Sequence, residues 1–348
     1  MPAKNVKKFI DAVGWPRLII GLFLLSLFTA APFVGVLVST SLSNTLERFG
    51  MNGVLVLAMV PMVQAGCGLN FGLPLGIIAG LLGATLSIEL GVRGVAGFAT
   101  AIGLAAPIAA VLGYCYGQLL NRVKGSEMMI ATYVGFSSVA FMCIAWFLLP
   151  YKSPTMIWGY GGSGLRTTIS VNGYWQHILS DFMAVRTGHL AIPVGTFLFL
   201  AAMCFLVWFF MKTKTGTAMT AVGSNPEFAH ASGVNVDRMR IVSVVLSTIL
   251  GAVGILVYAQ SFGFLQLYMG PFYMALPAVA SILLGGASVN KATIWNVLVG
   301  TFLFQGVLTM TPAVINNVLQ TDMSEVIRII VSNGMILYAL TRKVQVKR

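Results

Sequence analysis

Long, continuous runs of apolar residues, separated by short polar segments, dominate this chain. Most of the runs approach the roughly 20 apolar residues that a helix needs to cross a bilayer. Because they do not alternate between apolar and polar positions, they indicate helices and not the strands of a membrane barrel. The pattern predicts an all-α integral membrane protein with about ten transmembrane helices, at Leu18–Val38, Asn52–Gln64, Phe71–Glu89, Val95–Leu119, Met128–Leu149, Leu190–Met211, Ile241–Gln260, Phe272–Leu284, Ile294–Thr311 and Val326–Leu340.

The second and eighth runs differ from the others because they are short and interrupted. They contain Pro61 and Pro277, and they end in glycine-rich polar stretches at 65–70 and 285–290. Short spans with such breaks, in corresponding parts of two halves, are typical of transporters built from an internal repeat. The fifth and tenth runs also begin alike, with Ser-Glu before the apolar residues. We therefore expect two pseudo-repeated halves with a transport pathway between them.

Composition supports a membrane location. The chain has 348 residues, of which 57% are hydrophobic and only 9% charged, whereas a soluble domain carries about 25% charged residues. The first apolar run follows basic residues, as in a signal peptide, but further spans follow it, so we interpret it as an uncleaved helix. The cysteines lie in apolar runs without metal-ligand spacing, and we expect buried thiols at Cys67, Cys115, Cys143 and Cys204.

The positions of the basic residues predict the orientation. Ten spans place both termini on one side, and 15 of the 21 lysines and arginines fall on that side. Positive loops are cytoplasmic, which also accounts for the net charge of +12 without nucleic-acid binding. The prediction is one transmembrane domain over 1–348: a cytoplasmic N-terminus at 1–17, six spans within 18–211 with an outer loop at 151–189, a cytoplasmic loop at 212–240, four spans within 241–341 and a cytoplasmic tail at 342–348. A short interfacial helix is expected at Ile178–Val185 in the outer loop.

The segment from Lys212 to Arg240 is the one long polar island, and its residues predict two short helices. The first covers 217–222 and is closed by Gly223 in the left-handed conformation. Its successor is capped by Ser224 or Asn225, which accept hydrogen bonds from free backbone N–H groups. Pro226 fits the first helical position, Glu227 adds favourable charge to the first turn, and Gly233 closes the helix.

Two such short helices are marginally stable alone in water, so they need a packing partner. Small side chains allow a groove of another protein to approach closely, and they recur here at Ala218, Ala221, Ala229 and Ala231. Docking against another protein is therefore one interpretation. The alternative is an amphipathic connector that lies on the membrane surface.

The run from Ala221 to Val236, AVGSNPEFAHASGVNV, resembles the cytoplasmic coupling loop of inner-membrane permeases of ATP-binding-cassette importers. It looks like the branch that includes the ribose, simple-sugar, nucleoside and branched-chain amino-acid permeases. The segments 278–288 and 113–132 resemble the same family, and the resemblance covers roughly residues 50 to 340. It departs from the ribose-type pattern at Asn70, where an aspartate would stand, which weakens the assignment to ribose itself.

The resemblance implies the partners and the residues that contact them. Two ATP-binding-cassette ATPase subunits or domains would use ATP and Mg, an external substrate-binding protein would deliver the solute, and a second permease, identical or similar, would complete the pathway. The chain itself would bind no cofactor or metal and carry no catalytic residue; the string 285–293 lacks the Gly-Lys-Ser/Thr order of a phosphate-binding loop. The residues implied to contact the ATPase are Ala218, Ala221, Gly223, Ser224, Asn225, Pro226, Glu227, Phe228, Ala229, His230, Ala231, Ser232 and Gly233.

Polar residues inside membrane spans are costly and usually face a cavity or another polar group. Phe71 is added to the polar candidates for the solute pathway because an aromatic ring can stack on a sugar or a base. Each polar candidate has an alternative role in a hydrogen bond between helices. Few acidic groups lie at depth, so a proton or sodium relay is not indicated, and an uncharged polar solute fits better. The candidates for the solute pathway are Gln64, Asn70, Phe71, Thr132, Asn296 and Gln305.

The sequence therefore predicts a permease subunit of a bacterial inner-membrane importer, surrounded by lipid. Its solute is expected to be small and polar, a simple sugar such as a pentose first. A nucleoside or another small solute of the same branch is the alternative within the family. An ion-gradient-driven secondary transporter is the alternative outside it.

Overall fold

The computed structural model describes residues 15–158, 164–188, 190–319 and 323–341. The predicted tail at 342–348 and nearly all of the N-terminal segment at 1–17 lie outside these ranges. The helices are α2 (Trp15–Ala30), η1 (Ala31–Val34), α3 (Val38–Leu57), α4 (Met59–Gln64), α5 (Leu73–Glu89), α6 (Gly94–Arg122), α7 (Glu127–Leu148), α8 (Val194–Lys212), α9 (Lys214–Ser224), α10 (Pro226–Ala231), α11 (Val236–Phe262), α12 (Gly270–Leu284), α13 (Ile294–Leu319) and α14 (Ser324–Thr341).

Helices account for every predicted span. Seven of the described helical segments are long and apolar enough to cross a membrane, and α5 and α12 are shorter apolar helices. The last predicted run corresponds to α14, which has 18 residues. An all-α multi-pass membrane protein is thereby confirmed.

The second span is longer than predicted. Its helix begins at Val38, not at Asn52, and continues to Gln64 with a break at Ala58, between α3 and α4. The first half is polar, and Ser41, Ser43 and Thr45 in it are buried inside the protein. Buried hydroxyls there bond to the preceding turn, as Thr45 Oγ1 does to the Ser41 carbonyl at 2.8 Å. A polar helix segment is tolerated because protein, and not lipid, surrounds it.

Two small sheets lie in the predicted outer loop and beside it. Strand β1 (Thr168–Ser170) pairs antiparallel with β4 (Phe264–Gln266), and β2 (Val185–Thr187) pairs antiparallel with β3 (Leu190–Ile192). The predicted helix at Ile178–Val185 is wrong, because the segment forms turns and then enters β2. The sixth span begins at Val194, four residues later than predicted, because the preceding residues belong to β3.

The helices pack in the same order in both halves. Helix α5 contacts α6 and α7, and α12 contacts α13 and α14; each half also packs across the molecule, α11 on α6 and α3 on α13. This matches the predicted internal repeat. Close approach of α5 and α11 requires Gly76, where a Cβ atom would lie 2.6 Å from the Thr248 carbonyl oxygen.

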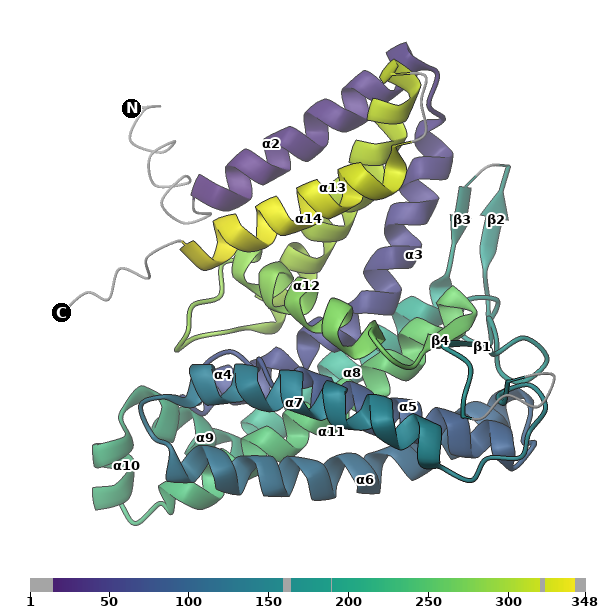
Figure 1. Ribbon diagram of the computed structural model, residues 1–348. Coiled ribbons are helices and arrows are strands. Elements are labelled where there is room, and N and C mark those ends of the chain that lie inside the picture. The colour runs from purple at the N-terminus through teal and green to yellow at the C-terminus, as the bar shows by residue number, and fades with distance from the viewer. Residues whose placement is uncertain (1–14, 159–163, 189, 320–322, 342–348) are drawn as a thin grey trace, which may run out of the picture.

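The two ends of the molecule differ in character. Helices α9 and α10 lie at one end, where α2 begins and α14 ends, and the β strands lie toward the opposite end (Figure 1). The first end is the one predicted to be cytoplasmic, and the second is the one predicted to be outside.

Candidate coupling surface and solute pathway

Helix α10 forms as its sequence predicts. The Asn225 side-chain oxygen accepts a hydrogen bond from the Phe228 backbone N–H at 3.0 Å, and Pro226 occupies the first helical position with Glu227 beside it. Gly233 has φ 83° and donates to the His230 carbonyl at 3.0 Å, which ends the helix. Asn225, and not Ser224, is the cap.

Helix α9 ends differently from the prediction. Gly223 lies inside the helix, which continues to Ser224, so the expected left-handed terminator at Gly223 is wrong. The structure gives a different reason for glycine at position 223: a Cβ atom there would meet the carbonyl of Gln64 and would lie 2.9 Å from the nitrogen of Gly66. Gly66, with φ 72°, ends the broken span. Helix α9 therefore packs backbone against backbone on the break after α4.

The side chains of the α9–α10 pair divide into a packed face and a free face. Ala229 is buried and Ala218 half-buried, so these two alanines pack inward, whereas Ala221 and Ala231 are exposed. Phe228 is 68% exposed at the end of the molecule. The other exposed members of the predicted set are Ser224, Asn225, Pro226, Glu227, His230, Ser232 and Gly233.

The end of the loop is anchored by two ion pairs of different burial. Arg240 of α11 pairs with Glu127 of α7, and their side chains are only 10% and 17% exposed. Lys124 Nζ lies 2.6 Å from Asp237 Oδ1, with side chains that are 50% and 56% exposed. Both pairs join the start of α11 to the α6–α7 junction, so the loop returns into the membrane at a fixed position.

Gln64 links the two halves. Its side-chain amide donates to the carbonyl of Ala292, in the segment that follows α12. Asn296 holds the same segment, because its Nδ2 donates to the Gly285 carbonyl at 2.7 Å and its Oδ1 accepts from the Thr293 N–H at 2.8 Å. The breaks after α4 and after α12 are therefore tied together next to α9.

Asn70 is fully buried in a polar network between helices. Its Nδ2 donates to Ser247 Oγ of α11 at 2.8 Å, and its Oδ1 accepts from the Tyr116 hydroxyl of α6 at 3.4 Å. Ser247 Oγ in turn donates to the carbonyl of Ala58, at the break between α3 and α4. The network satisfies the Asn70 amide within this conformation and holds the break against α11.

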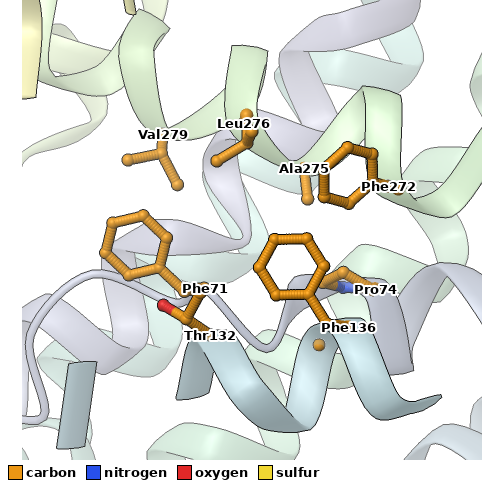
Figure 2. A pocket seen from close by; sticks show the side chains of 9 residues that line it. Phe71, Pro74, Thr132, Phe136, Phe272, Ala275, Leu276 and Val279 are labelled. Carbon is orange, nitrogen blue, oxygen red and sulfur yellow. The ribbon is translucent and has the colours of Figure 1, made fainter. Parts of the chain in front are cut away.

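Phe71 and Thr132 meet at an apolar cavity of about 30 Å³ between the two halves. The rings of Phe71 and Phe136 point toward Leu276 and Val279 of α12 (Figure 2). Phe136 and Phe272 are in contact, with ring centroids 4.9 Å apart. The complete lining is Phe71, Pro74, Thr132, Gly135, Phe136, Phe272, Ala275, Leu276 and Val279.

The sequence did not single out Phe136 and Phe272, because an aromatic residue in an apolar run reads equally well as a lipid contact. Thr132 contributes little polarity to the cavity, since its hydroxyl donates to the Met128 carbonyl at 2.8 Å. Gln305 is buried in α13 and does not line this cavity. Among the residues that the structure describes, no group of three or more His, Cys, Asp and Glu side chains could hold a metal ion.

Comparison with known proteins gives one family and several distant relatives. Residues 41–339 match the family described as the permease component of the branched-chain amino acid transport system. The chain is 24% identical to the ribose import permease protein of Haemophilus influenzae over 75% of this chain and 73% of that protein. It is 23% identical to a nucleoside ABC transporter permease protein of Lactococcus lactis over 64% of this chain and 60% of that protein.

A third relative is the autoinducer 2 import system permease protein of Photorhabdus luminescens, 24% identical over 75% of this chain and 72% of that protein. No solved structure matches the chain.

Proposed function

This chain belongs to the family of branched-chain amino acid transport system permease components, within the ATP-binding-cassette importers, and we propose that it forms the membrane pathway for a small polar solute. It is a multi-pass protein of the inner membrane. We propose a simple sugar such as a pentose as the first solute, because relatives carry a ribose import and a galactose import function in their names.

The observation that carries the proposal is the packing of α9 on the broken span. A force on α9 reaches the backbone at Gln64 and Gly66 directly, because no side chain lies between Gly223 and these residues. Gln64 passes the displacement to Ala292 in the other half. A rigid contact of this kind suits a partner that biases a bundle between two states.

The proposed partners follow from the free face of α10. Two ATPase subunits or domains bind at Phe228 and its exposed neighbours, with ATP and Mg held by those subunits. An external binding protein delivers the solute on the side of the β strands. A second permease, a copy or a similar chain, pairs with this one in the membrane.

A nucleoside is the second candidate solute. Phe71, Phe136 and Phe272 present aromatic rings to the cavity between the halves, and rings of this kind stack on a nucleobase as well as on the apolar face of a sugar. One relative is named as a nucleoside permease.

The test is reconstitution in liposomes with an ATP-binding-cassette ATPase and a substrate-binding protein from the same organism. We expect ATP-dependent uptake of labelled ribose or, for the second candidate, of labelled uridine. We also expect the ATPase to co-purify with the wild type and to be lost from Glu227→Arg. Uptake that proceeds without ATP, by a chain that purifies without an ATPase, would identify a gradient-driven transporter and overturn the proposal.

A further inference from the structure

A second, larger cavity lies away from the aromatic one, among α3, α11, α13 and α14. Its volume is about 430 Å³, and polar side chains dominate its lining. Asn44 and Glu47 also line a neighbouring cavity beside β2 and β3. Through these shared residues the large cavity adjoins the face of the molecule that is predicted to be outside.

Two arginines line this cavity from opposite ends of the chain. Arg48 comes from α3 and Arg328 from α14. Because both guanidinium groups line one cavity, their positive charges repel each other. Tyr258 of α11 lies near both guanidinium groups. Bringing two like charges together inside a membrane domain costs free energy unless an anion joins them.

Internal partners compensate this charge only in part. Arg328 pairs with Glu325 through Nη1 at 3.0 Å, but its buried Nε has no hydrogen-bond partner. Within the described part of the chain, Arg48 forms no ion pair and no side-chain hydrogen bond. Glu47 also lines the cavity, and its negative charge attracts Arg48, although it is not within ion-pair distance of either arginine in that part of the chain.

We infer that this cavity binds the anionic group, a carboxylate or a phosphate, of a small hydroxylated solute. Guanidinium groups form strong, directional hydrogen bonds with both anions. Asn44 and Thr309 line the same space and supply groups that can bond to hydroxyls. The assignment to a transported solute rests on the proposed import function and would make that solute an acidic or phosphorylated sugar in place of a neutral one, whereas the binding itself does not depend on that function.

The experiment compares pairs of compounds that differ in one anionic group. The full chain is placed in nanodiscs of zwitterionic lipid, and dissociation constants are measured by titration calorimetry for ribose 5-phosphate against ribose and for glucuronate against glucose. We expect the anionic member of at least one pair to bind at least about tenfold more tightly, since a hydrogen bond to a charged group contributes about 1.5–3 kcal/mol.

The variants identify the arginines. Arg48→Gln and Arg328→Gln should each weaken binding of the anionic compound by about tenfold or more. Arg48→Lys keeps the positive charge, so it should retain part of the affinity and show that the site is still folded. Arg93→Gln is the matched control, because Arg93 lies over the Tyr174 ring and does not line the cavity. Equal loss in Arg93→Gln, or equal binding of charged and neutral compounds, or no binding of any of them, overturns the inference.

A lipid headgroup is the other source of the same anion. In nanodiscs that contain phosphatidylglycerol, a solute site should keep its affinity for the anionic compound. A small change in affinity that the wild type and the Arg93→Gln control show equally reflects the charge of the membrane and not competition at the cavity. If the lipid abolishes binding in the wild type, the cavity holds a headgroup, and the assignment to a solute is wrong. ATP-dependent uptake is measured separately, so a failure of the import function does not alter the result in nanodiscs.

Discussion

The backbone of Gly223 in α9 lies directly against that of Gly66, at the break after α4. A Cβ atom on Gly66 would be 3.0 Å from Gly223 Cα, and one on Gly223 would be 2.9 Å from Gly66 nitrogen. No side chain can enter this contact without moving one of the two segments. Helix α9, which leads directly into α10 and its exposed residues, is therefore fixed to the point where the membrane span is broken.

Gly223→Ala should separate α9 from this break. The added methyl group overpacks the contact with the Gln64 carbonyl, at a cost of about 1–3 kcal/mol in the free energy of unfolding. ATP-driven uptake should fall more than ATPase binding does. Gly103→Ala is the control, since nothing lies within 4 Å of a Cβ atom there. Equal uptake by both variants would show that this contact does not transmit the motion.

Arg240→Gln should destabilise the protein far more than Lys124→Gln. The first change leaves Glu127 largely buried without its partner, and loss of one member of a buried pair costs about 3–5 kcal/mol; partial exposure places this pair near the lower value. The second breaks an exposed pair, which contributes about 0–1 kcal/mol. Unfolding in detergent, followed by tryptophan fluorescence, measures both. Similar destabilisation by the two variants would contradict the difference in burial.

Phe136 and Phe272 should be energetically coupled across the two halves. Their rings are 4.9 Å apart between α7 and α12, and aromatic pairs contribute about 0.5–1.5 kcal/mol beyond their burial. A double-mutant cycle of Phe136→Ala and Phe272→Ala should recover a coupling free energy of about 1 kcal/mol. The comparison is Phe205 and Phe209, an exposed pair on α8 at 6.3 Å. Additive effects at Phe136 and Phe272 would mean that the halves do not bind through this contact.

The apolar runs of the sequence were sufficient to predict the helices, because hydropathy reports directly on the solvent around a span. The second span shows the limit of this argument. Its first half is as polar as a loop, yet Ser41, Ser43 and Thr45 are buried inside the protein. Hydropathy cannot distinguish a segment that protein surrounds from one that water surrounds. Only the packing of α3 on α13, far away in the sequence, explains why a helix forms there.

The candidate site was predicted less completely, because a residue type does not specify its partner. Gly223 suits both a left-handed helix end and a close helix contact, and the contact with Gln64 decides between them. Asn70 suits both a pathway and an internal bond, and its partner Ser247 lies 177 positions away. Capping is local, so the sequence narrowed the cap of α10 to Ser224 or Asn225, and the structure assigns it to Asn225.

Phe228→Ala should weaken ATPase binding strongly without altering the fold. The side chain is 68% exposed at the tip of α10, so its loss should change the free energy of unfolding by no more than about 0.5 kcal/mol. An exposed aromatic anchor that enters a partner's pocket commonly contributes about 2 kcal/mol or more to binding, which corresponds to roughly 30-fold weaker association. Phe264→Ala is the matched control, because this phenylalanine is 44% exposed in β4, toward the opposite end of the molecule. Surface plasmon resonance measures the affinity of the ATPase for each variant in nanodiscs. We expect weaker binding to Phe228→Ala than to Phe264→Ala, and equal affinity would place the docking surface elsewhere.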